Sequence, residues 1–375
     1  MPKRAILGLS VIFLFSITVF ALPGFSKEPN SACDPQKDPK LSQANAANVE
    51  GLKLLDNGKP AEALAKFEEA EKMQPAFKDA VFNHAIALAR LGRHEEAITK
   101  FDQALQLQEK WEWALLMKGD SLFELKRPDE AMTNYRKAIA AKPEFRDPYL
   151  RIAAMELANN RPDKTQAILE EGLKASPDDV DLNWQLGLLF MGQGKGQAFG
   201  CFKKVEVKDP ERPQLPENLA MSAYLANDKA SAAKYAQLSI QKNPEDYQGH
   251  WMLVSLFIEE SNWVKCREIL DRMIVKWPEN RTLRLTMLKT LILSRAFNEA
   301  EKYAESLKAV APKEGQWMES IALEMLSSLE TIKENRDTMA VPFFKLAREL
   351  FMKALNMDGV RRMDKALNPA PPKKQ

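Results

Sequence analysis

The chain has 375 residues, a length that would usually correspond to two or three globular domains. Its 54 basic and 52 acidic side chains nearly cancel, so it lacks the concentrated positive charge that nucleic-acid binding needs. A hydrophobic content of 45% with only 15 glycines, and many Ala, Leu, Lys and Glu residues, is typical of a mostly helical protein.

The N-terminus has the pattern of an export segment. Two basic residues precede the uncharged run 5–22, and small residues follow it. This order predicts a secretory signal peptide over residues 1–26, cleaved after Ala21 or Ser26. The apolar run is also just long enough to span a hydrocarbon core, so an uncleaved N-terminal anchor is the alternative. Either outcome places the rest of the chain outside the cytoplasm.

The next segment, residues 27–43, contains three prolines and many polar side chains. This composition predicts a disordered linker. Cys33 lies within it, more than ten residues beyond the apolar run and without an apolar residue shortly before it. Its position therefore argues against a lipid-modified cysteine.

From residue 44 onward, two residue types recur with one period. A small or apolar residue returns every 34 residues, with one step of 33, at Gly51, Ala85, Gly119, Ala153, Gly187, Ala220, Val254, Leu288 and Ala322. A proline returns in the same phase at Pro75, Pro143, Pro177, Pro210, Pro244, Pro278 and Pro312, with Glu109 in place of one. Because two independent series keep one phase, the chain is predicted to be an array of internal repeats.

The clearest copy of the repeat is residues 112–145. It contains Leu115-x2-Lys118-Gly119-x2-Leu122, then Ala131-x3-Tyr135-x2-Ala138, then Pro143. This pattern resembles the tetratricopeptide repeat, a helix-turn-helix unit. The resemblance implies an all-α fold, a right-handed α-α superhelix whose concave wall is lined by the first helix of each unit.

The repeat spacing predicts eight regular units over residues 44–314 and an altered ninth over 315–359. In the ninth, the second-helix pattern Ala347-x3-Phe351-x2-Ala354 begins 13 residues after position 334, where the period would place it. We therefore expect a long first helix and a loop between Ser327 and Pro342. An array needs an end unit that covers its apolar face, and the ninth unit is placed to be this C-terminal cap. Residues 360–375 are expected to form a flexible tail.

No enzyme motif is found in the sequence. It has no Gly-rich phosphate loop, no GxSxG, no CxxC and no HExxH. The three cysteines are too few and scattered for a disulfide framework, and the three histidines have no metal-ligand spacing. Adjacent carboxylates such as Glu95 and Glu96 fit a solvated helix face better than a catalytic pair. We therefore expect no catalytic residue, no metal and no cofactor.

The side chains of the concave wall can be predicted from their offset to the small residue of each unit. Side chains should face away from the second helix when they lie three residues before the small residue, one residue after it, or four or five residues after it. From the side chains at these offsets, and with Trp113 at the groove edge, we take as candidates for partner binding Phe82, Ile86, Trp113, Leu116, Asp120, Phe123, Leu150, Leu157, Trp184, Leu188, Met191, Tyr224 and Trp251. Two interpretations remain for this set. The side chains either pack against the neighbouring first helices as core, or form an apolar groove that binds a partner.

One recognition mode of the family is not expected here. Some cytoplasmic co-chaperones of this family hold a peptide's terminal carboxylate with a clamp of Lys, Arg and Asn on the concave wall. The corresponding positions are Asn48, Leu52, Phe82, Ile86 and Leu116, none of which is basic. Recognition should therefore depend on apolar contacts, for example with a partner helix in the groove.

These observations predict a non-enzymatic protein–protein interaction scaffold in a cell envelope, assumed to be bacterial. It would be periplasmic, or anchored in the inner membrane and facing the periplasm, and would bind a protein or peptide partner, for example in the assembly of an envelope complex. One alternative is a carrier or sensor of an apolar small molecule such as a lipid or glycan fragment. Another is self-assembly through the ends of the array. No nucleic-acid partner is expected, and membrane contact only through an uncleaved N-terminal segment.

Overall fold

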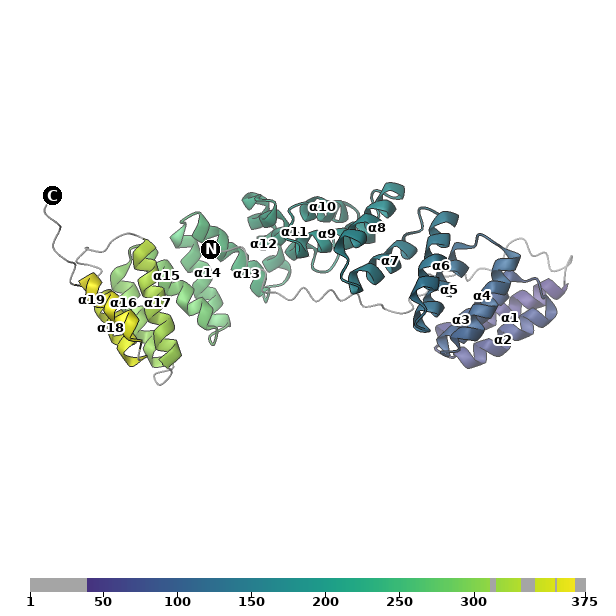
Figure 1. Ribbon diagram of the computed structural model, residues 1–375, viewed down its shortest axis with the longest axis horizontal. Coiled ribbons are helices and arrows are strands. Elements are labelled where there is room, and N and C mark those ends of the chain that lie inside the picture. The colour runs from purple at the N-terminus through teal and green to yellow at the C-terminus, as the bar shows by residue number, and fades with distance from the viewer. Residues whose placement is uncertain (1–38, 311–314, 332–340, 355, 368–375) are drawn as a thin grey trace. The chain divides into compact units, whose positions relative to one another are not determined.

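The computed structural model describes residues 39–310, 315–331, 341–354 and 356–367 (Figure 1). The predicted signal segment lies outside these residues. The described part is helical and contains no strand. Its helices form two compact units, unit 1 ending at Arg212 and unit 2 starting at Pro213. None of the described helices is long and apolar enough to cross a membrane.

The helices of unit 1 are, in chain order, α1 (Pro39–Asp56), α2 (Pro60–Met73), α3 (Lys78–Arg90), α4 (His94–Leu107), α5 (Glu112–Glu124), α6 (Pro128–Ala141), α7 (Arg146–Ala158), α8 (Pro162–Ala175), α9 (Val180–Gly192) and α10 (Ala198–Lys208). The described helices of unit 2 are α11 (Leu215–Leu225), α12 (Lys229–Lys242), α13 (Tyr247–Glu259), α14 (Trp263–Lys276), α15 (Arg281–Leu293), α16 (Phe297–Val310), α17 (Gly315–Thr331), α18 (Val341–Lys353) and α19 (Met357–Leu367).

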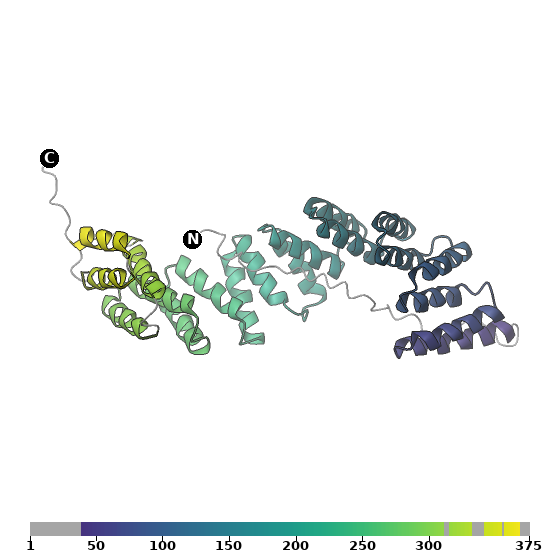
Figure 2. The same cartoon turned by 60° about the horizontal axis from the view of Figure 1, so that its bottom comes forward.

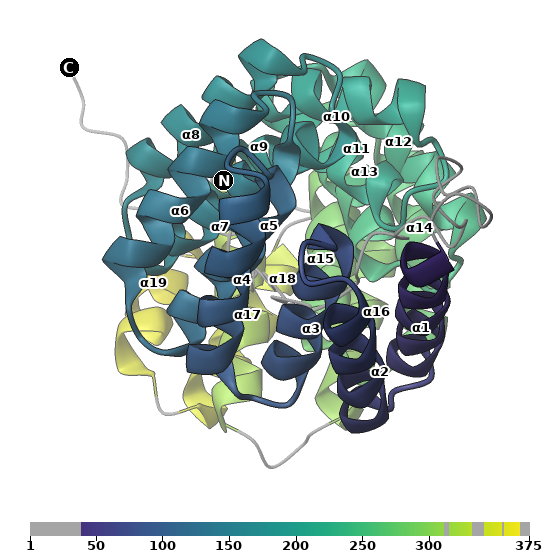
Figure 3. The ribbon, with the colours of Figure 1, turned by 90° about the vertical axis from the view of Figure 1, so that its right-hand side faces the viewer.

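Each odd-numbered helix from α1 to α17 is the first helix of a repeat and packs against the helix that follows it (Figure 2). First helices also contact the first helices of neighbouring repeats, as α1 does with α3, α7 with α9, and α15 with α17. The first helices therefore line the inner side of each unit. Within unit 1, successive pairs are turned relative to one another (Figure 3). The all-α repeat fold predicted from the sequence is confirmed.

The turn inside each regular repeat has one backbone feature in common. The seventh residue after the small residue has a positive φ between 56° and 74°, at Gly58, Gly92, Lys126, Asn160, Gly194, Asn227, Ser261 and Arg295. The next amide donates to the carbonyl five residues earlier, as Lys59 does to Leu54 at 2.9 Å. This left-handed helix ending satisfies free carbonyls and favours glycine, since other residues are strained there.

The small residue of each unit is explained by its contact with the second helix. A Cβ atom added to Gly51 would lie 2.5 Å from the ring of Phe67, and one added to Gly119 would lie 2.5 Å from the ring of Tyr135. Both rings are buried. In the repeats that have glycine here, the ring of the second helix therefore occupies the space that a side chain of the first helix would need.

Two boundaries differ from the sequence prediction. Helix α1 begins at Pro39, inside the expected linker, because proline is tolerated in the first turn of a helix, where its missing N–H is not needed. At the other end, α19 occupies much of the expected tail. Its first turn is capped by Asn356, whose Oδ1 accepts a hydrogen bond from the Gly359 amide at 2.9 Å. Gly359 therefore lies in a helix start rather than after a helix end, and Val360 is buried against the core of unit 2.

The helices over the predicted ninth repeat are α17 and α18. Its first helix, α17, has 17 residues, against 13 in most of the other first helices, and α18 packs against it. Much of the predicted loop, residues 332–340, lies outside the described part of the chain. Together α17, α18 and the additional α19 form the C-terminal end of unit 2.

Candidate functional site

Some residues predicted to face a partner are buried. These are Phe82, Ile86 and Leu116, each 1% exposed, and Trp184, 8% exposed. The ring of Phe82 lies 5.7 Å from that of Phe101 and 4.6 Å from that of Trp111, measured between centroids. For these four the groove prediction is corrected, because neighbouring helices cover them and they hold successive helices together.

The other predicted residues are half-buried and keep accessible surface: Trp113, Asp120, Phe123, Leu150, Leu157, Leu188 and Met191 in unit 1, and Tyr224 and Trp251 in unit 2. Five apolar side chains from three consecutive first helices of unit 1 form what we call the inner strip. They are Phe123 of α5, Leu150 and Leu157 of α7, and Leu188 and Met191 of α9. Trp113 lies with its ring 4.5 Å from that of the buried Phe145, at the start of α5.

An ion pair links α5 and α7 beside the inner strip. The Asp120 carboxylate accepts hydrogen bonds from the Tyr135 hydroxyl at 2.8 Å and from Arg151 Nε at 2.9 Å. Burial, and then the negative charge of Asp120, raise the pKa of Tyr135 far above its usual range, so its hydroxyl stays protonated and donates. Asp120 is thus committed to internal contacts. Arg151 bonds it through Nε and Nη2, and its side chain is 31% exposed.

The first two repeats are joined by a buried pair of amides. Asn83 Nδ2 of α3 donates to Asn48 Oδ1 of α1 at 2.9 Å, and both side chains are buried. Asn83 Oδ1 is buried without a hydrogen-bond partner among the described residues. Of the positions corresponding to a carboxylate clamp, Asn48 is therefore hydrogen-bonded within the fold, and the others have apolar side chains.

Unit 2 contains a group of rings that we call the aromatic cluster. It consists of Tyr247, His250 and Trp251 of α13 and Trp277, which follows α14, and all four are half-buried. The rings of Tyr247 and Trp251 are nearly parallel, 7° apart in plane and 6.2 Å between centroids. The ring of Trp277 stands at 82° to that of Tyr247, at 5.1 Å, and at 77° to that of His250, at 5.8 Å.

Of this cluster, only Trp251 was predicted from the sequence. Tyr247 lies seven residues before Val254, and Trp277 lies one before Pro278, which are not concave-wall offsets. The signal that could have revealed them is a comparison between repeats. The positions equivalent to Tyr247 hold Lys78, Glu112 and Arg146, and an aromatic residue among such polar side chains is not needed to build the repeat.

Two segments of unit 1 match models of a known family. Residues 48–110 and residues 122–186 each match a model described as tetratricopeptide repeat. Both segments comprise helix pairs with the packing and turns described above. The chain contains tetratricopeptide repeats. No curated protein matches it in sequence.

Several solved structures are similar to this tetratricopeptide-repeat protein at low identity. The pilF protein of Pseudomonas aeruginosa is 17% identical, with 56% of this chain and 97% of that chain covered and a TM-score of 0.45. The C-terminal part of a TPR repeat-containing protein from Cytophaga hutchinsonii is 16% identical, with 62% and 96% covered and a TM-score of 0.49. PilW, described as a type IV pilus biogenesis factor, is 21% identical, with 56% and 98% covered and a TM-score of 0.41.

Tetratricopeptide repeats bind protein or peptide partners, so the repeats support a protein-interaction scaffold. The described residues contain no group of three His, Cys, Asp or Glu that could hold a metal ion. Burial raises the pKa of the Cys201 thiol to about 11, so it is protonated and unreactive at neutral pH. Cys266 is buried beside Thr290.

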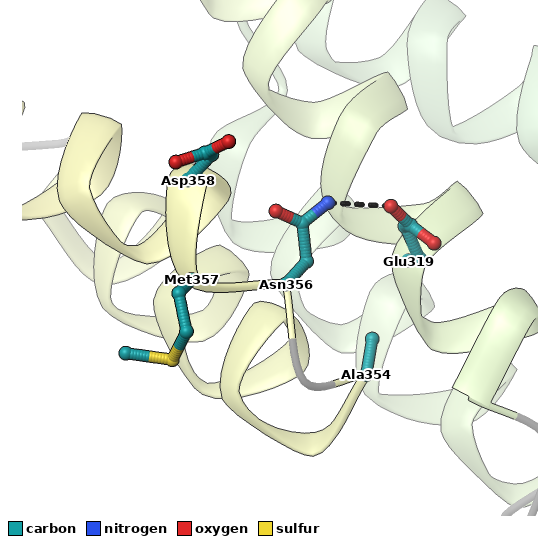
Figure 4. A pocket seen from close by; sticks show the side chains of 5 residues that line it. All are labelled: Glu319, Ala354, Asn356, Met357 and Asp358. Carbon is teal, nitrogen blue, oxygen red and sulfur yellow. Dashed lines mark hydrogen bonds between the residues drawn. The ribbon is translucent and has the colours of Figure 1, made fainter.

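A surface pocket of the tetratricopeptide-repeat protein lies at the end of unit 2 (Figure 4). It is lined by Glu319 of α17, by Ala354 and Asn356 between α18 and α19, and by Met357 and Asp358 of α19. Asn356 donates a hydrogen bond to Glu319 across it. Because most of its side chains are polar and two are acidic, this pocket is unsuited to a lipid chain.

Proposed function

We propose that this protein is an exported, non-enzymatic scaffold that holds a segment of a protein partner along the inner strip of unit 1. The observation that carries the proposal is the inner strip itself, five half-buried apolar side chains on three consecutive first helices. Apolar side chains that keep accessible surface on successive first helices of a repeat array are candidates for contact with a partner.

The chemistry of the strip suggests what it would bind. Phe123, Leu157 and Met191 stand at the same offset, four residues after the small residue of successive units, so they would meet apolar side chains spaced along one partner segment. Completing the burial of each such side chain is worth on the order of 1 kcal/mol. Beside them, the Arg151 side chain, 31% exposed, is held in place by Asp120 and can donate to a backbone carbonyl of the partner.

Capture of a partner by variants of the full chain tests this function. Leu157→Glu puts a charge in the centre of the strip and should weaken capture about tenfold or more, and Phe123→Ala should act in the same direction. Val207→Glu is the matched control, because Val207 lies on the second helix α10 and is 76% exposed. Equal capture by the Leu157 and Val207 variants, with unchanged helicity, would refute the assignment of the strip.

Export belongs to the same proposal and rests on the sequence of residues 1–26. If the signal is cleaved, the mature protein should start at Leu22 or Lys27. N-terminal sequencing of protein purified from its own cells measures this. Protein that starts at its first residues and fractionates with membranes would support the anchor instead, and the same protein in the cytoplasmic fraction would contradict export.

A further inference from the structure

We propose that the aromatic cluster of unit 2 binds the proline-containing C-terminal segment of a second copy of this chain. The cluster is separate from the inner strip, which belongs to unit 1, so this inference does not depend on the function proposed above. The segment concerned is residues 368–375, Asn-Pro-Ala-Pro-Pro-Lys-Lys-Gln, which lies outside the described part of the chain.

The cluster is not required by the repeat architecture. The positions equivalent to Trp277 hold Gln74, Gln108 and Lys142, and the same helices pack there without a ring. In unit 2 the rings of Tyr247, Trp251 and Trp277 rest on the core, and all four rings remain partly exposed. Rings that stay accessible where the fold would accept polar side chains are candidates for binding.

The geometry of the rings suits a proline-rich ligand. Tyr247 and Trp251 form two parallel surfaces, and Trp277 forms a wall perpendicular to the first of them. Asn280 donates to the Tyr247 hydroxyl at 3.2 Å, which fixes the position of that ring. Proline-rich segments dock in grooves lined by such aromatic rings, because the preformed polyproline II helix loses little entropy on binding.

The C-terminal segment has the matching pattern. Pro369 and Pro372 are three residues apart, so in a polyproline II helix they would lie on one side, roughly 9 Å apart. Lys373 and Lys374 follow them. Glu245 already pairs with Lys276 at 2.7 Å, so the exposed Glu279, next to the cluster in sequence, is the carboxylate that can receive one of these lysines, although Arg281 and Arg284 are also close in sequence. The rings, rather than net charge, therefore provide the recognition.

The segment must come from a second copy, because it is too short to reach from the end of α19 to the aromatic cluster of its own chain. From Leu367, where α19 ends, five residues lead to Pro372, a reach of about 16 Å in polyproline II form. Within unit 2, α19 is separated from α13 by α18, α17, α15 and α14 (Figure 1). Neighbouring helix axes are roughly 8–10 Å apart, so the segment is too short to reach its own cluster. Contact between the tail of one copy and α13 of another is a heterologous contact that can continue from copy to copy.

The test uses a fluorescent peptide of residues 366–375 and the full chain, followed by anisotropy. We expect the peptide to bind, and Trp277→Ala to weaken binding about thirtyfold. Trp263→Ala is the control, since Trp263 is a half-buried tryptophan of the same unit outside the cluster. A peptide with Pro369→Ala and Pro372→Ala should lose binding to the same extent, and this variant cannot disturb the fold of the binding copy.

Sedimentation of the full chain tests the second-copy arrangement. The sedimentation coefficient should rise with concentration for the full chain and stay constant for a chain ending at Leu367. Absence of peptide binding, or equal binding of the peptide without prolines, would overturn the proposal. A full chain that binds the peptide yet sediments as a monomer at every concentration would overturn the assignment to a second copy.

Discussion

The contact between Gly119 and Tyr135 predicts that one added methyl group destabilises unit 1. In Gly119→Ala the new Cβ would lie 2.5 Å from Cε1 and 2.8 Å from Cδ1 of Tyr135, distances that require the ring to move. Tyr135 is buried and its hydroxyl bonds to Asp120, so both ends of the ring are held. Overpacking of this kind costs about 1–3 kcal/mol, whereas alanine in place of glycine gains up to about 1 kcal/mol of helix propensity. We expect a net loss of about 1–2 kcal/mol.

The preceding repeat shows why the expected loss of stability in Gly119→Ala should not be larger than this. There the small residue is Ala85 and the ring is Phe101, so the helix pair can accommodate a methyl group when the ring has no hydroxyl to hold it. The matched control is Gly200→Ala in α10, where an added Cβ meets nothing within 4 Å and helix propensity should stabilise the protein by about 0.5–1 kcal/mol. Urea denaturation followed by circular dichroism measures both. If Gly119→Ala raises the midpoint as Gly200→Ala does, the close-approach explanation of the repeat period is wrong.

Two further predictions concern stability. Ser261→Gly should stabilise unit 2 by about 1 kcal/mol, since Ser261 has a φ of 56° that glycine adopts without strain; a lowered thermal midpoint would contradict this. Burial disfavours the Glu71 carboxylate, but bonds from His84 at 2.7 Å and Lys100 at 2.6 Å outweigh it and lower the pKa of Glu71. Because the pKa of Glu71 is lower in the folded protein than in the unfolded chain, where it is about 4.3, ionised Glu71 stabilises the fold above that pH, and this stability is lost as the pH falls through the folded-state pKa. Glu71→Gln should therefore flatten the dependence of the thermal midpoint on pH below about 5. An unchanged slope would show that Glu71 contributes nothing.

The repeat period could be predicted from the sequence because it depends on contacts inside one helix pair. Gly119 and Tyr135 touch each other whatever the next repeat contains, so their spacing recurs along the chain. The left-handed turns are also local, and Asn160 and Gly58 carry their usual residue types. Ser261 and Arg295 do not, yet their backbones follow the same course because the flanking helices fix it.

The candidate site was predicted less well, because accessibility depends on neighbouring repeats. The offset that leaves Leu188 half-exposed, one residue after the small residue, also selects Ile86, which is buried because α3 contacts both α1 and α5. The aromatic cluster depends on Trp277, which is distant in sequence from Tyr247 and meets it only when α14 packs against α13. No pattern within a single repeat contains this information.

Crosslinking in living cells tests the central claim most directly. A photoreactive amino acid at Leu157, in the inner strip, is compared with one at Val207, on the outer side of the same unit. The scaffold function predicts that a discrete polypeptide is crosslinked from Leu157, that Phe123→Ala reduces its yield, and that Val207 gives none of it. The same polypeptide crosslinked equally from both positions, or none from Leu157 in cells that make the protein at its natural level, would contradict the account.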